Sequence, residues 1–368
     1  MKLVIFGLTI SSSWGNGHAT LWRALCRALA SRGHRIIFFE HDRPYYAAHR
    51  DFFELPGGRI EFYPDWNEIR AQAKRELAGA DAAMVTSYCS DGAAAADLLM
   101  EAPAGLNLFY DLDTPVTLAA LREGVKVDYL GPRGLSDFDL VLSYTGGRAL
   151  EELASRLQAR RVATLYGSVD PAMHCRVAAR PELSADLSYL GTYAADRQTA
   201  LVELFIEPAR RLRERRFLIG GAQYPDTFPW TPNIFFLRHL EPAQHPAFFS
   251  SSRLTLNVTR AAMKAMGYCP SGRLFEAAAC GVPILSDTWE GLDEFFTPGA
   301  EILLARSRED AVAALELSDA ELRRMADQAR QRVLDEHTAM HRAMELENLL
   351  AGTEVSAGHA LATEVGGK

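Results

Sequence analysis

The chain alternates short runs of apolar residues with segments whose apolar residues recur at helical spacing. The apolar run Lys2–Leu8 precedes a loop rich in glycine and serine, a helical segment over 18–34 and a second apolar run, Arg35–Glu40. Buried runs joined by amphipathic helices are typical of β-α-β units, which build parallel sheets with helices on both faces. The beginning of the chain is therefore predicted to be an α/β domain.

The alternation continues and then restarts after a loop-like stretch with two prolines, between Ser168 and Leu187. Apolar runs predict further strands at 81–88, 105–113, 138–145 and 160–166, and after the loop at 187–193, 215–222, 233–240, 253–260, 282–287 and 300–305. A helix is predicted over 196–212, and a long segment rich in arginine, glutamate and leucine predicts helix from about Asp319 to Leu350.

These patterns predict two Rossmann-like domains that face each other across a cleft. We place the N-terminal domain at 1–168 and the C-terminal domain at 188–335. A C-terminal helix over 336–350 is expected to cross back to the first domain, and 351–368 is expected to be a mobile tail. Ligands of such sheets bind at the carboxyl ends of the strands, so the site residues should follow strands.

The composition and net charge disfavour several classes of function. The chain has 368 residues, 48% of them hydrophobic, and a formal net charge of −8. No broad basic face is implied, so nucleic acid is not an expected partner. The start of the chain is read as a first strand and not a signal peptide, and no stretch approaches the roughly 18 apolar residues of a membrane span. Five scattered cysteines indicate reduced thiols, a cytoplasmic location and no cysteine-based metal site: Cys26, Cys89, Cys175, Cys269 and Cys280.

The most specific candidate chemistry lies in "PSGRLFEAAACGVPILSDTWEGLDEFF", residues 270–296. Pro270 and Ser271 are helix-start signals, and the free N–H groups of a helix start favour a phosphate. Arg273 adds positive charge near that end, and Glu276 follows one turn later. A carboxylate at this place accepts two hydrogen bonds from a vicinal diol such as a ribose. The alternative is a first-turn glutamate favoured by the helix dipole and paired with Arg273.

Within this stretch, "FEAAACGVPIL" resembles the "EAMACGxPVI" signature of retaining nucleotide-sugar glycosyltransferases with two Rossmann-like domains, the GT-B fold. The longer "LNVTRAAMKAMGYCPSGRLFEAAACGVPILSDTWEGLDEFF" and the N-terminal "SSSWGNGHATLWRAL" resemble the CgeB-like (spore maturation protein B-like) branch, over roughly Met1–Leu350. The resemblance implies that Glu276 holds the nucleotide ribose, that the second domain binds the donor and the first the acceptor, and that no cofactor or metal is needed.

The sequence departs from the family at one position. The family's E-x7-E pair places a second glutamate, which contacts the donor sugar, where this chain has Tyr268. Arg260, Lys264 or Ser271 is a candidate for the same space. The departure weakens the implication that anomeric configuration is retained.

Other donor-binding residues are also implied by the resemblance. Gly191, Thr192 and Arg197 match the turn and basic residue that receive the diphosphate, and an arginine there stabilises a departing nucleoside diphosphate. An exposed arginine at a helix start is the alternative reading of Arg197. His239, which follows a predicted strand, is expected near the nucleotide base.

The loop after the first strand supplies candidates in the first domain. Its residues Gly15, Asn16 and Gly17 are expected near the cleft, and His18 is expected to bind donor phosphate or assist the acceptor, with a structural histidine as the alternative. The two glycines and Glu40 also partly mimic a dinucleotide fingerprint. The third glycine is missing, so NAD or FAD is not predicted.

Asp111 and Asp113 end the predicted strand at 105–113. They resemble the metal-binding D-x-D of the other large glycosyltransferase fold, but that fold has one main domain. We predict instead a carboxylate pair that faces the cleft and orients the acceptor hydroxyl or acts as a base. Turn capping by Asp113 is the alternative. An aromatic set is expected either to stack on an acceptor or to belong to the core: Trp14, Tyr45, Tyr46 and Tyr110.

The sequence therefore predicts a glycosyltransferase of the hexosyltransferase type that moves a sugar from a UDP- or GDP-type donor to an unknown glycan, protein or small-molecule acceptor, without a metal. Two alternatives remain open. One is a UDP-sugar 2-epimerase of the same fold, which a product assay separates. The other is a non-catalytic nucleotide-sugar-binding protein of the spore-coat type, which predicts donor binding without turnover.

Overall fold

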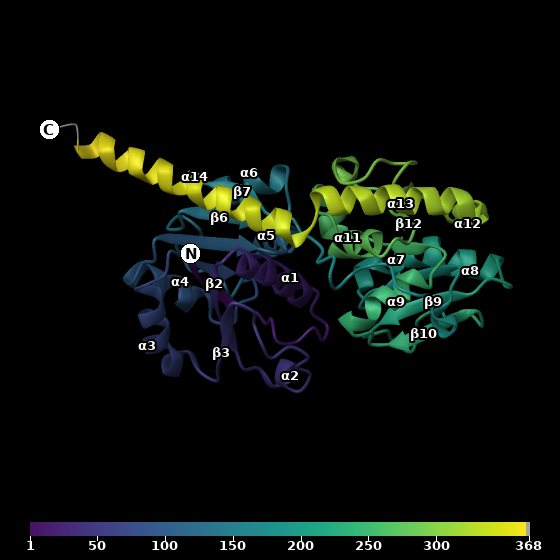
Figure 1. Cartoon of the computed structure of the whole chain (residues 1–368), viewed down its shortest axis with the longest axis horizontal. Helices are drawn as coiled ribbons and strands as arrows, with labels where there is room; N and C mark the ends of the chain where they lie inside the picture. Colours follow the sequence, from purple (N-terminus) through teal and green to yellow (C-terminus); the bar gives the residue numbers. More distant parts are fainter. Residues whose placement is uncertain (366–368) are drawn as a thin grey trace. The chain divides into compact units, whose positions relative to one another are not determined.

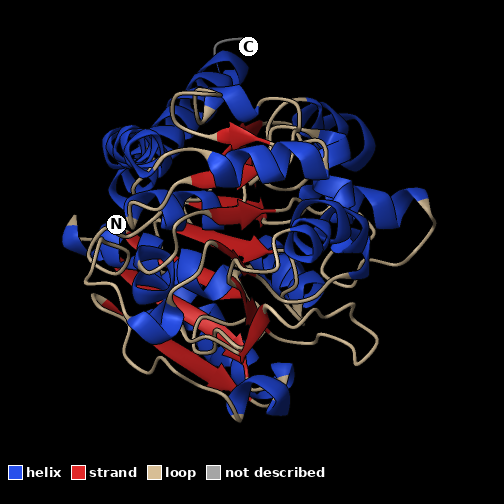
Figure 2. Cartoon of the chain, turned by 90° about the vertical axis from the view of Figure 1, so that its right-hand side faces the viewer, coloured by secondary structure: helices blue, strands red, loops and turns tan. Residues whose placement is uncertain are grey.

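A computed structural model describes the backbone of residues 1–365 and the side chains of residues 1–353. The chain divides into two compact units, one made of Met1–Tyr166 with Ala339–Lys368 and the other of Gly167–Thr338. Each unit holds a parallel β-sheet with helices packed on it (Figure 1, Figure 2). The predicted fold class, α/β with two Rossmann-like domains, is confirmed.

The sheet of the first unit has the strand order β3-β2-β1-β4-β5-β6-β7, and all its pairs are parallel. Its strands are β1 (Lys2–Gly7), β2 (Arg35–His41), β3 (Gly58–Tyr63), β4 (Ala82–Thr86), β5 (Leu106–Asp111), β6 (Leu140–Ser143) and β7 (Val162–Thr164). Its helices are α1 (His18–Ser31), α2 (Pro44–Ala47), α3 (Trp66–Leu77), α4 (Gly92–Glu101), α5 (Thr114–Arg122), α6 (Arg148–Leu157) and α14 (Ala339–Val365).

The second unit repeats this arrangement with the order β10-β9-β8-β11-β12-β13, again parallel throughout. Its strands are β8 (Leu187–Leu190), β9 (Phe217–Gly221), β10 (Ile234–Arg238), β11 (Thr255–Asn257), β12 (Ile284–Ser286) and β13 (Leu303–Leu304). Its longer helices are α7 (Gln198–Leu201), α8 (Glu207–Arg211), α9 (His245–Ser250), α10 (Ala261–Met266), α11 (Gly272–Ala279), α12 (Arg308–Glu316) and α13 (Asp319–Glu336). Short 3₁₀ turns lie at Pro181–Leu183, Ala195–Arg197, Pro242–Gln244 and Leu292–Glu294, and a π-helical turn at Val202–Ile206.

In each sheet the first strand of the unit lies in the interior, and the order in which later strands are added reverses beside it. In the first unit the reversal lies between β1 and β4, where Leu3 pairs with Ala82, and in the second it lies between β8 and β11, where Leu256 pairs with Tyr189. The loops that leave the carboxyl ends of two such strands diverge, and the crevice that results is where open α/β sheets bind ligands. The two reversals therefore mark the places where functional side chains are sought.

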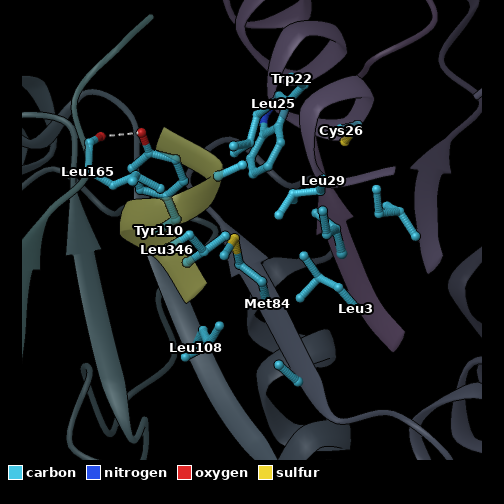
Figure 3. Packing of buried hydrophobic residues seen from close by; sticks show 14 of the residues in the cluster. Leu3, Trp22, Leu25, Cys26, Leu29, Met84, Leu108, Tyr110, Leu165 and Leu346 are labelled. Carbon is cyan, nitrogen blue, oxygen red and sulfur yellow. Dashed lines mark hydrogen bonds between the residues drawn. The ribbon is translucent and has the colours of Figure 1, made fainter. Parts of the chain in front are cut away.

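The core of the first unit joins both ends of the chain. Trp22, Leu25 and Leu29 of α1 pack in one buried cluster with strand residues such as Leu3 and with Leu346 of α14 (Figure 3). In the same cluster the Tyr110 hydroxyl donates a hydrogen bond to the Leu165 carbonyl oxygen over 2.6 Å. Tyr110 is thus a core residue, and its predicted alternative role in stacking on an acceptor is wrong.

Helix α14 lies along α1 (Figure 1) and differs from the predicted C-terminal segment in both bounds. It begins at Ala339, because α13 ends before His337 and Thr338, and it continues beyond Leu350 to Val365. Residues 351–365 of the predicted mobile tail are therefore helical, and the mobility of this segment stays a prediction. Thr353 is buried and donates its hydroxyl hydrogen bond to the Leu349 carbonyl oxygen, 2.7 Å away. Residues 366–368 of the predicted tail lie outside the described part.

Truncating Leu346 to alanine is expected to destabilise the first unit by roughly 2–5 kcal/mol, because the side chain is fully buried between α1 and the sheet. Urea unfolding followed by circular dichroism measures the effect. Met340 of the same helix is 39% exposed, so Met340→Ala is the matched control, with a change within about 0.5 kcal/mol. Equal losses in both variants would contradict the packing described.

Two further predictions concern the whole chain. Its five cysteines all lie in the described residues and are free thiols, as predicted, and burial raises the pKa of Cys26 to about 12. Among the described residues, no helix combines the length and the apolar character needed to cross a membrane. The cytoplasmic location stays a prediction.

Candidate functional site

The carboxyl edge of the second sheet carries most of the predicted donor-binding residues. Gly191 and Thr192 follow β8, His239 follows β10, and Arg260 comes shortly after β11. Gly191 is required by its surroundings, because a Cβ atom there would lie 2.9 Å from the Tyr189 hydroxyl oxygen. The backbone of this turn is therefore packed tightly beside the point where the strand order reverses.

Two arginines meet at Tyr189, whose side chain is fully buried. Arg197 donates a hydrogen bond from Nη1 to the Tyr189 hydroxyl over 3.0 Å, and the guanidinium carbon of Arg273 lies 5.9 Å from the centre of the Tyr189 ring. Among the described residues neither guanidinium has an ion pair with a carboxylate, and Arg197 Nε is buried without a hydrogen-bond partner. Burial, and next the positive charge of Arg197, hold the pKa of Arg273 below its ordinary value. Such a pair is suited to bind an anion with two or more charges.

Glu276 lies one turn inside α11, and its side chain is 15% exposed. Its alternative role, an ion pair with Arg273, is not present in the described residues. The nearest basic group is His245, whose Nδ1 lies 3.8 Å from Glu276 Oε2. Burial lowers the pKa of His245 to about 4, although the charge of Glu276 opposes the shift. Glu276 therefore faces a neutral imidazole near neutral pH.

Two residues of this region were not predicted as site residues, His174 and His245. His174 belongs to the turn after β7, in the stretch expected to be a linker, and its ring centre lies 5.9 Å from that of His245. One ligand-type atom each of His174, His245 and Glu276 lies within 4.8 Å of the others. No local motif marks either histidine, because the three residues meet only through the tertiary fold.

The remaining predicted donor residues have separate surroundings. Ser271 precedes α11 without capping it through its side chain. Arg260 pairs with Asp196 over 3.4 Å. His239 has a φ of 52° and donates its backbone N–H to the Gly221 carbonyl oxygen over 2.7 Å. Tyr268 has a φ of 48°, and its ring packs on Gly291, so the residue that replaces the family glutamate has a strained backbone.

At the carboxyl edge of the first sheet, His18 and Asp113 come together. His18 is the first residue of α1, and its Nε2 lies 3.5 Å from Asp113 Oδ2. Its other ring nitrogen, Nδ1, is buried without a hydrogen-bond partner. Tyr88, which follows β4, lies beside the pair with its ring centre 5.8 Å from that of His18, and burial followed by the charge of Asp113 raises its pKa. Tyr88 was not predicted from the sequence.

The predicted pair of cleft-facing carboxylates is wrong for one member. Asp111 is fully buried, whereas Asp113 is partly exposed. Asp111 accepts the backbone N–H of Asp113 at Oδ1 over 3.1 Å, so its direct effect is to hold the turn that carries Asp113. Burial raises the pKa of Asp111 to about 6, partly offset by hydrogen bonds from Thr117, the Asp113 backbone and Ser87.

The loop that contains Gly15, Asn16 and Gly17 is fixed from within. The Asn16 side-chain amide donates to the carbonyl oxygens of Thr9 and Ser12, and its oxygen accepts the His18 backbone N–H. Gly15 has a φ of 61°, which favours glycine. The loop thus sets the position of His18.

Glu40 holds the same loop from the neighbouring strand. Its carboxylate accepts hydrogen bonds from the Thr9 and Ser11 hydroxyls and from the backbone N–H groups of Ile10 and Ser11. Because the Glu40 carboxylate already accepts four hydrogen bonds within the protein, it is not available to bind a ribose. The dinucleotide reading, already disfavoured by the missing glycine, loses its acidic residue.

Other aromatic candidates gather on the second helix and its flanks. Trp14 stacks on His49 with ring centres 4.1 Å apart, and Tyr45 and Tyr46 of α2 contact each other edge to face. Tyr45 is half exposed, so stacking of this group on an acceptor stays a prediction.

The raised pKa of Asp111 predicts a pH dependence of stability. A carboxyl whose folded pKa is raised stabilises the fold below its unfolded pKa near 3.9, and this contribution is lost as the pH rises through about 6. Relative to Asp111→Asn, the wild type should lose on the order of 3 kcal/mol of unfolding free energy between pH of about 4 and 7. Urea unfolding across that range measures it. Asp128→Asn, at a highly exposed side chain, is the control, and a difference that is independent of pH would contradict the prediction.

A comparison with family models gives a match to part of the chain. Residues 197–348 match a family described as "Glycosyl transferase-like". The matched region contains α11 with Arg273 and Glu276, and it begins at Arg197. The prediction of a glycosyltransferase is confirmed at this level, whereas the CgeB-like branch stays a prediction. No curated protein matches the sequence.

Solved structures are similar to this chain in fold over both of its units. Sucrose-phosphate synthase from Thermosynechococcus elongatus superposes with a TM-score of 0.71 at 14% identity, covering 97% of this chain and 100% of that one. HepE of Anabaena, in complex with UDP and glucose, gives 0.66 at 10% identity, covering 96% and 100%. An alpha-glucosyltransferase in complex with UDP-glucose and DNA containing an abasic site gives 0.66 at 11%, covering 95% and 99%. The chain therefore has the GT-B fold.

Proposed function

We propose that the protein transfers a glycosyl group from a nucleoside diphosphate sugar of the UDP or GDP type to an acceptor. The observation that carries this proposal is the pair of arginines at Tyr189, Arg197 and Arg273, which lack carboxylate partners among the described residues. Two positive charges held together without a counter-ion repel each other, and a diphosphate removes that repulsion. The same charges stabilise the diphosphate as it leaves the sugar.

Glu276 is assigned to the nucleotide ribose. It lies one turn from Arg273 on α11 and forms no ion pair with it, so the two side chains are free to bind adjacent parts of one ligand. A carboxylate accepts hydrogen bonds from both hydroxyls of a vicinal diol. Gly191 and Thr192, in the turn after β8, are assigned to the diphosphate on the same grounds of place, and His239 to the base.

His18 and Asp113 are assigned to the acceptor hydroxyl. The carboxylate lies 3.5 Å from Nε2 of the imidazole, an arrangement in which Asp113 orients His18. Proton transfer by a group of this kind contributes roughly 10²–10⁴-fold to a rate. Asp111 has a positioning role through the Asp113 backbone.

The finer features of the reaction rest on the resemblance to the retaining family. We propose transfer with retention of anomeric configuration and without a metal in the transfer step, in a protein of the cytoplasm. HepE and the alpha-glucosyltransferase are in complex with UDP and glucose or with UDP-glucose, which supports a UDP-type donor. One of them is in complex with DNA, so the exclusion of nucleic acid as a partner rests on the acidic net charge alone.

A panel of nucleotide sugars tests the proposal on the full chain. UDP-glucose, UDP-N-acetylglucosamine, GDP-mannose and ADP-glucose are added separately, and thermal unfolding is recorded with each. A donor present at 100 times its Kd should add about 2.7 kcal/mol of stability. Stabilisation by one base class, followed by slow release of free sugar from that donor, is the expected result. No stabilisation by any donor would contradict the proposal.

The same assay separates the alternatives. Donor binding with neither sugar release nor transfer would indicate the non-catalytic binding protein. Conversion of a UDP-N-acetylhexosamine to its 2-epimer without an acceptor would indicate the epimerase. Proton NMR of the first sugar released shows which anomer forms, and release of the anomer opposite to that of the donor would contradict retention.

A further inference from the structure

A group of metal-ligand side chains lies beside the proposed ribose contact. His174 comes from the turn after β7, His245 is the first residue of α9, and Glu276 belongs to α11. One nitrogen or oxygen atom from each lies within 4.8 Å of the others, and His174 is 2% exposed. Three elements of one unit thus bring two imidazoles and a carboxylate together in a largely buried place.

The hydrogen bonds of His245 determine which of its nitrogens faces Glu276 as an acceptor. Its Nε2 lies 3.2 Å from the Leu240 carbonyl oxygen, which accepts hydrogen bonds but cannot donate one. Nε2 therefore carries the ring proton of the neutral imidazole. Nδ1 then directs a lone pair toward the region of Glu276 Oε2, 3.8 Å away. A carbonyl that fixes the tautomer of a histidine in this way is the usual support behind a metal ligand.

The buried polar atoms of this group have no donor to satisfy them. His245 Nδ1 and His174 Nε2 are both buried without a hydrogen-bond partner among the described residues. An acceptor nitrogen that faces a carboxylate oxygen is unfavourable unless a positive charge or a donor lies between them. The Arg273 guanidinium packs toward Tyr189 and forms no ion pair with Glu276.

We propose that His174, His245 and Glu276 bind a divalent transition-metal ion of the Zn²⁺ type. Two imidazoles and one carboxylate form a ligand set that zinc and related ions prefer, with one or more positions left for water or a substrate oxygen. Metal–ligand bonds of about 2.0–2.1 Å require the three ligand atoms to lie roughly 3.3 Å apart. Metal binding therefore requires the Glu276 and His174 side chains to move closer to His245 than the 4.8 Å observed.

A consequence follows for the donor, and this consequence rests on the proposed function. The Glu276 carboxylate that coordinates a metal is no longer free to accept both ribose hydroxyls. Zn²⁺ and the nucleotide should therefore compete, so that the metal inhibits the enzyme. The metal site itself depends on the three side chains and not on the transferase assignment.

Metal titration of the full chain tests the site directly. The protein is freed of metal with a chelator and titrated with Zn²⁺ against a colorimetric competitor, and with Co²⁺ for its visible spectrum. The wild type should bind one Zn²⁺ and give the intense Co²⁺ bands of a four- or five-coordinate site. His174→Ala and His245→Ala should each weaken Zn²⁺ binding by more than about 100-fold, beyond the 10–100-fold typical of an outer-sphere change.

Control variants keep the test interpretable. His49→Ala removes an imidazole of the other unit that is no part of this group, and it should leave Zn²⁺ binding unchanged. Should an alanine variant not fold, His174→Asn and His245→Gln keep a polar side chain of similar size and are expected to lose the Co²⁺ bands. Zn²⁺ uptake by the wild type no greater than by the His174→Asn/His245→Gln double variant would overturn the proposal.

A second titration, with UDP, separates this proposal from the proposed function. An increase in the apparent Kd of UDP with Zn²⁺ in the wild type, absent in His245→Gln, supports both. Zn²⁺ uptake that leaves UDP binding unchanged supports the metal site and contradicts the ribose role of Glu276. UDP binding that needs Glu276, in a protein that takes up no Zn²⁺, overturns the metal site and supports the ribose role of Glu276.

Discussion

Replacing Glu276 by glutamine is expected to weaken the binding of UDP by roughly 10- to 100-fold in metal-free protein. The substitution keeps the shape of the side chain but removes the charge that strengthens its hydrogen bonds to the ribose, and hydrogen bonds to charged groups are worth about 1.5–3 kcal/mol. Glu276→Ala, which removes both acceptor oxygens, should bind UDP at least as weakly. Isothermal titration calorimetry with UDP measures both variants.

The matched control for Glu276 is Glu294→Gln, at an exposed carboxylate of the same unit. It should bind UDP as the wild type does. Because the basic group nearest to Glu276, the His245 imidazole at 3.8 Å, is uncharged near neutral pH, replacing Glu276 should leave the thermal stability of the free protein within about 1 kcal/mol. Unchanged UDP affinity in a folded Glu276→Ala protein would contradict the ribose assignment.

Replacing Arg273 by alanine is expected to lower kcat by roughly 10²–10³-fold, with a smaller change in KM. The negative charge on the diphosphate grows as the bond to the sugar breaks, so a fixed positive charge acts more strongly on the transition state than on the bound donor. Arg273→Lys should recover part of the loss, because it restores the charge but not the planar fork. Steady-state release of UDP gives both constants.

Arg306 offers the control for this charge change. Its side chain is exposed in the same unit, and Arg306→Ala should leave kcat and KM unchanged. Arg197→Ala should resemble Arg273→Ala, because the two guanidiniums meet at one tyrosine. A variant whose KM rises while kcat stays constant would show that the arginine contributes to binding alone and not to leaving-group stabilisation.

The fold could be predicted from the sequence where strands are buried on both faces. β1, β4 and β5 are largely apolar and almost entirely buried, and such runs are readily recognised. Residues 58–77 carry no predicted element, although they contain β3 and α3. β3 is an edge strand with mostly half-buried residues, and α3 is polar apart from a narrow apolar stripe. Both depend on tertiary contacts more than on a local pattern.

The helix predicted over 196–212 is present at that position, but it is not a continuous α-helix. It is interrupted by a π-helical turn at Val202–Ile206. Pro208 follows that turn, and a proline inside a helix lacks the N–H that the regular hydrogen-bond pattern requires. The wider turn accommodates that missing donor.

Some residues of the candidate site could likewise be predicted from a local motif, and others could not. Arg273 and Glu276 share one short helix, so their pattern and its chemistry are visible in a single motif. Asp111 and Asp113 were expected to act together. Asp111 is the last residue of a strand that is buried on both faces, so its side chain lies inside the protein. Tyr189, His174 and His245 are scattered along the sequence, and only the folded second unit shows that they lie beside the two charged residues of α11.

The position of α14 determines the order in which the two units can complete their folding during synthesis. Residues 167–338 form one uninterrupted unit, whereas the first unit receives Ala343, Leu346 and Leu350 only at the end of synthesis. The N-terminal unit therefore cannot complete its core until translation ends, and the apolar side of α1 stays uncovered while the rest of the chain is synthesised. Until then that surface is a target for chaperones and for aggregation, as transiently exposed apolar surfaces are.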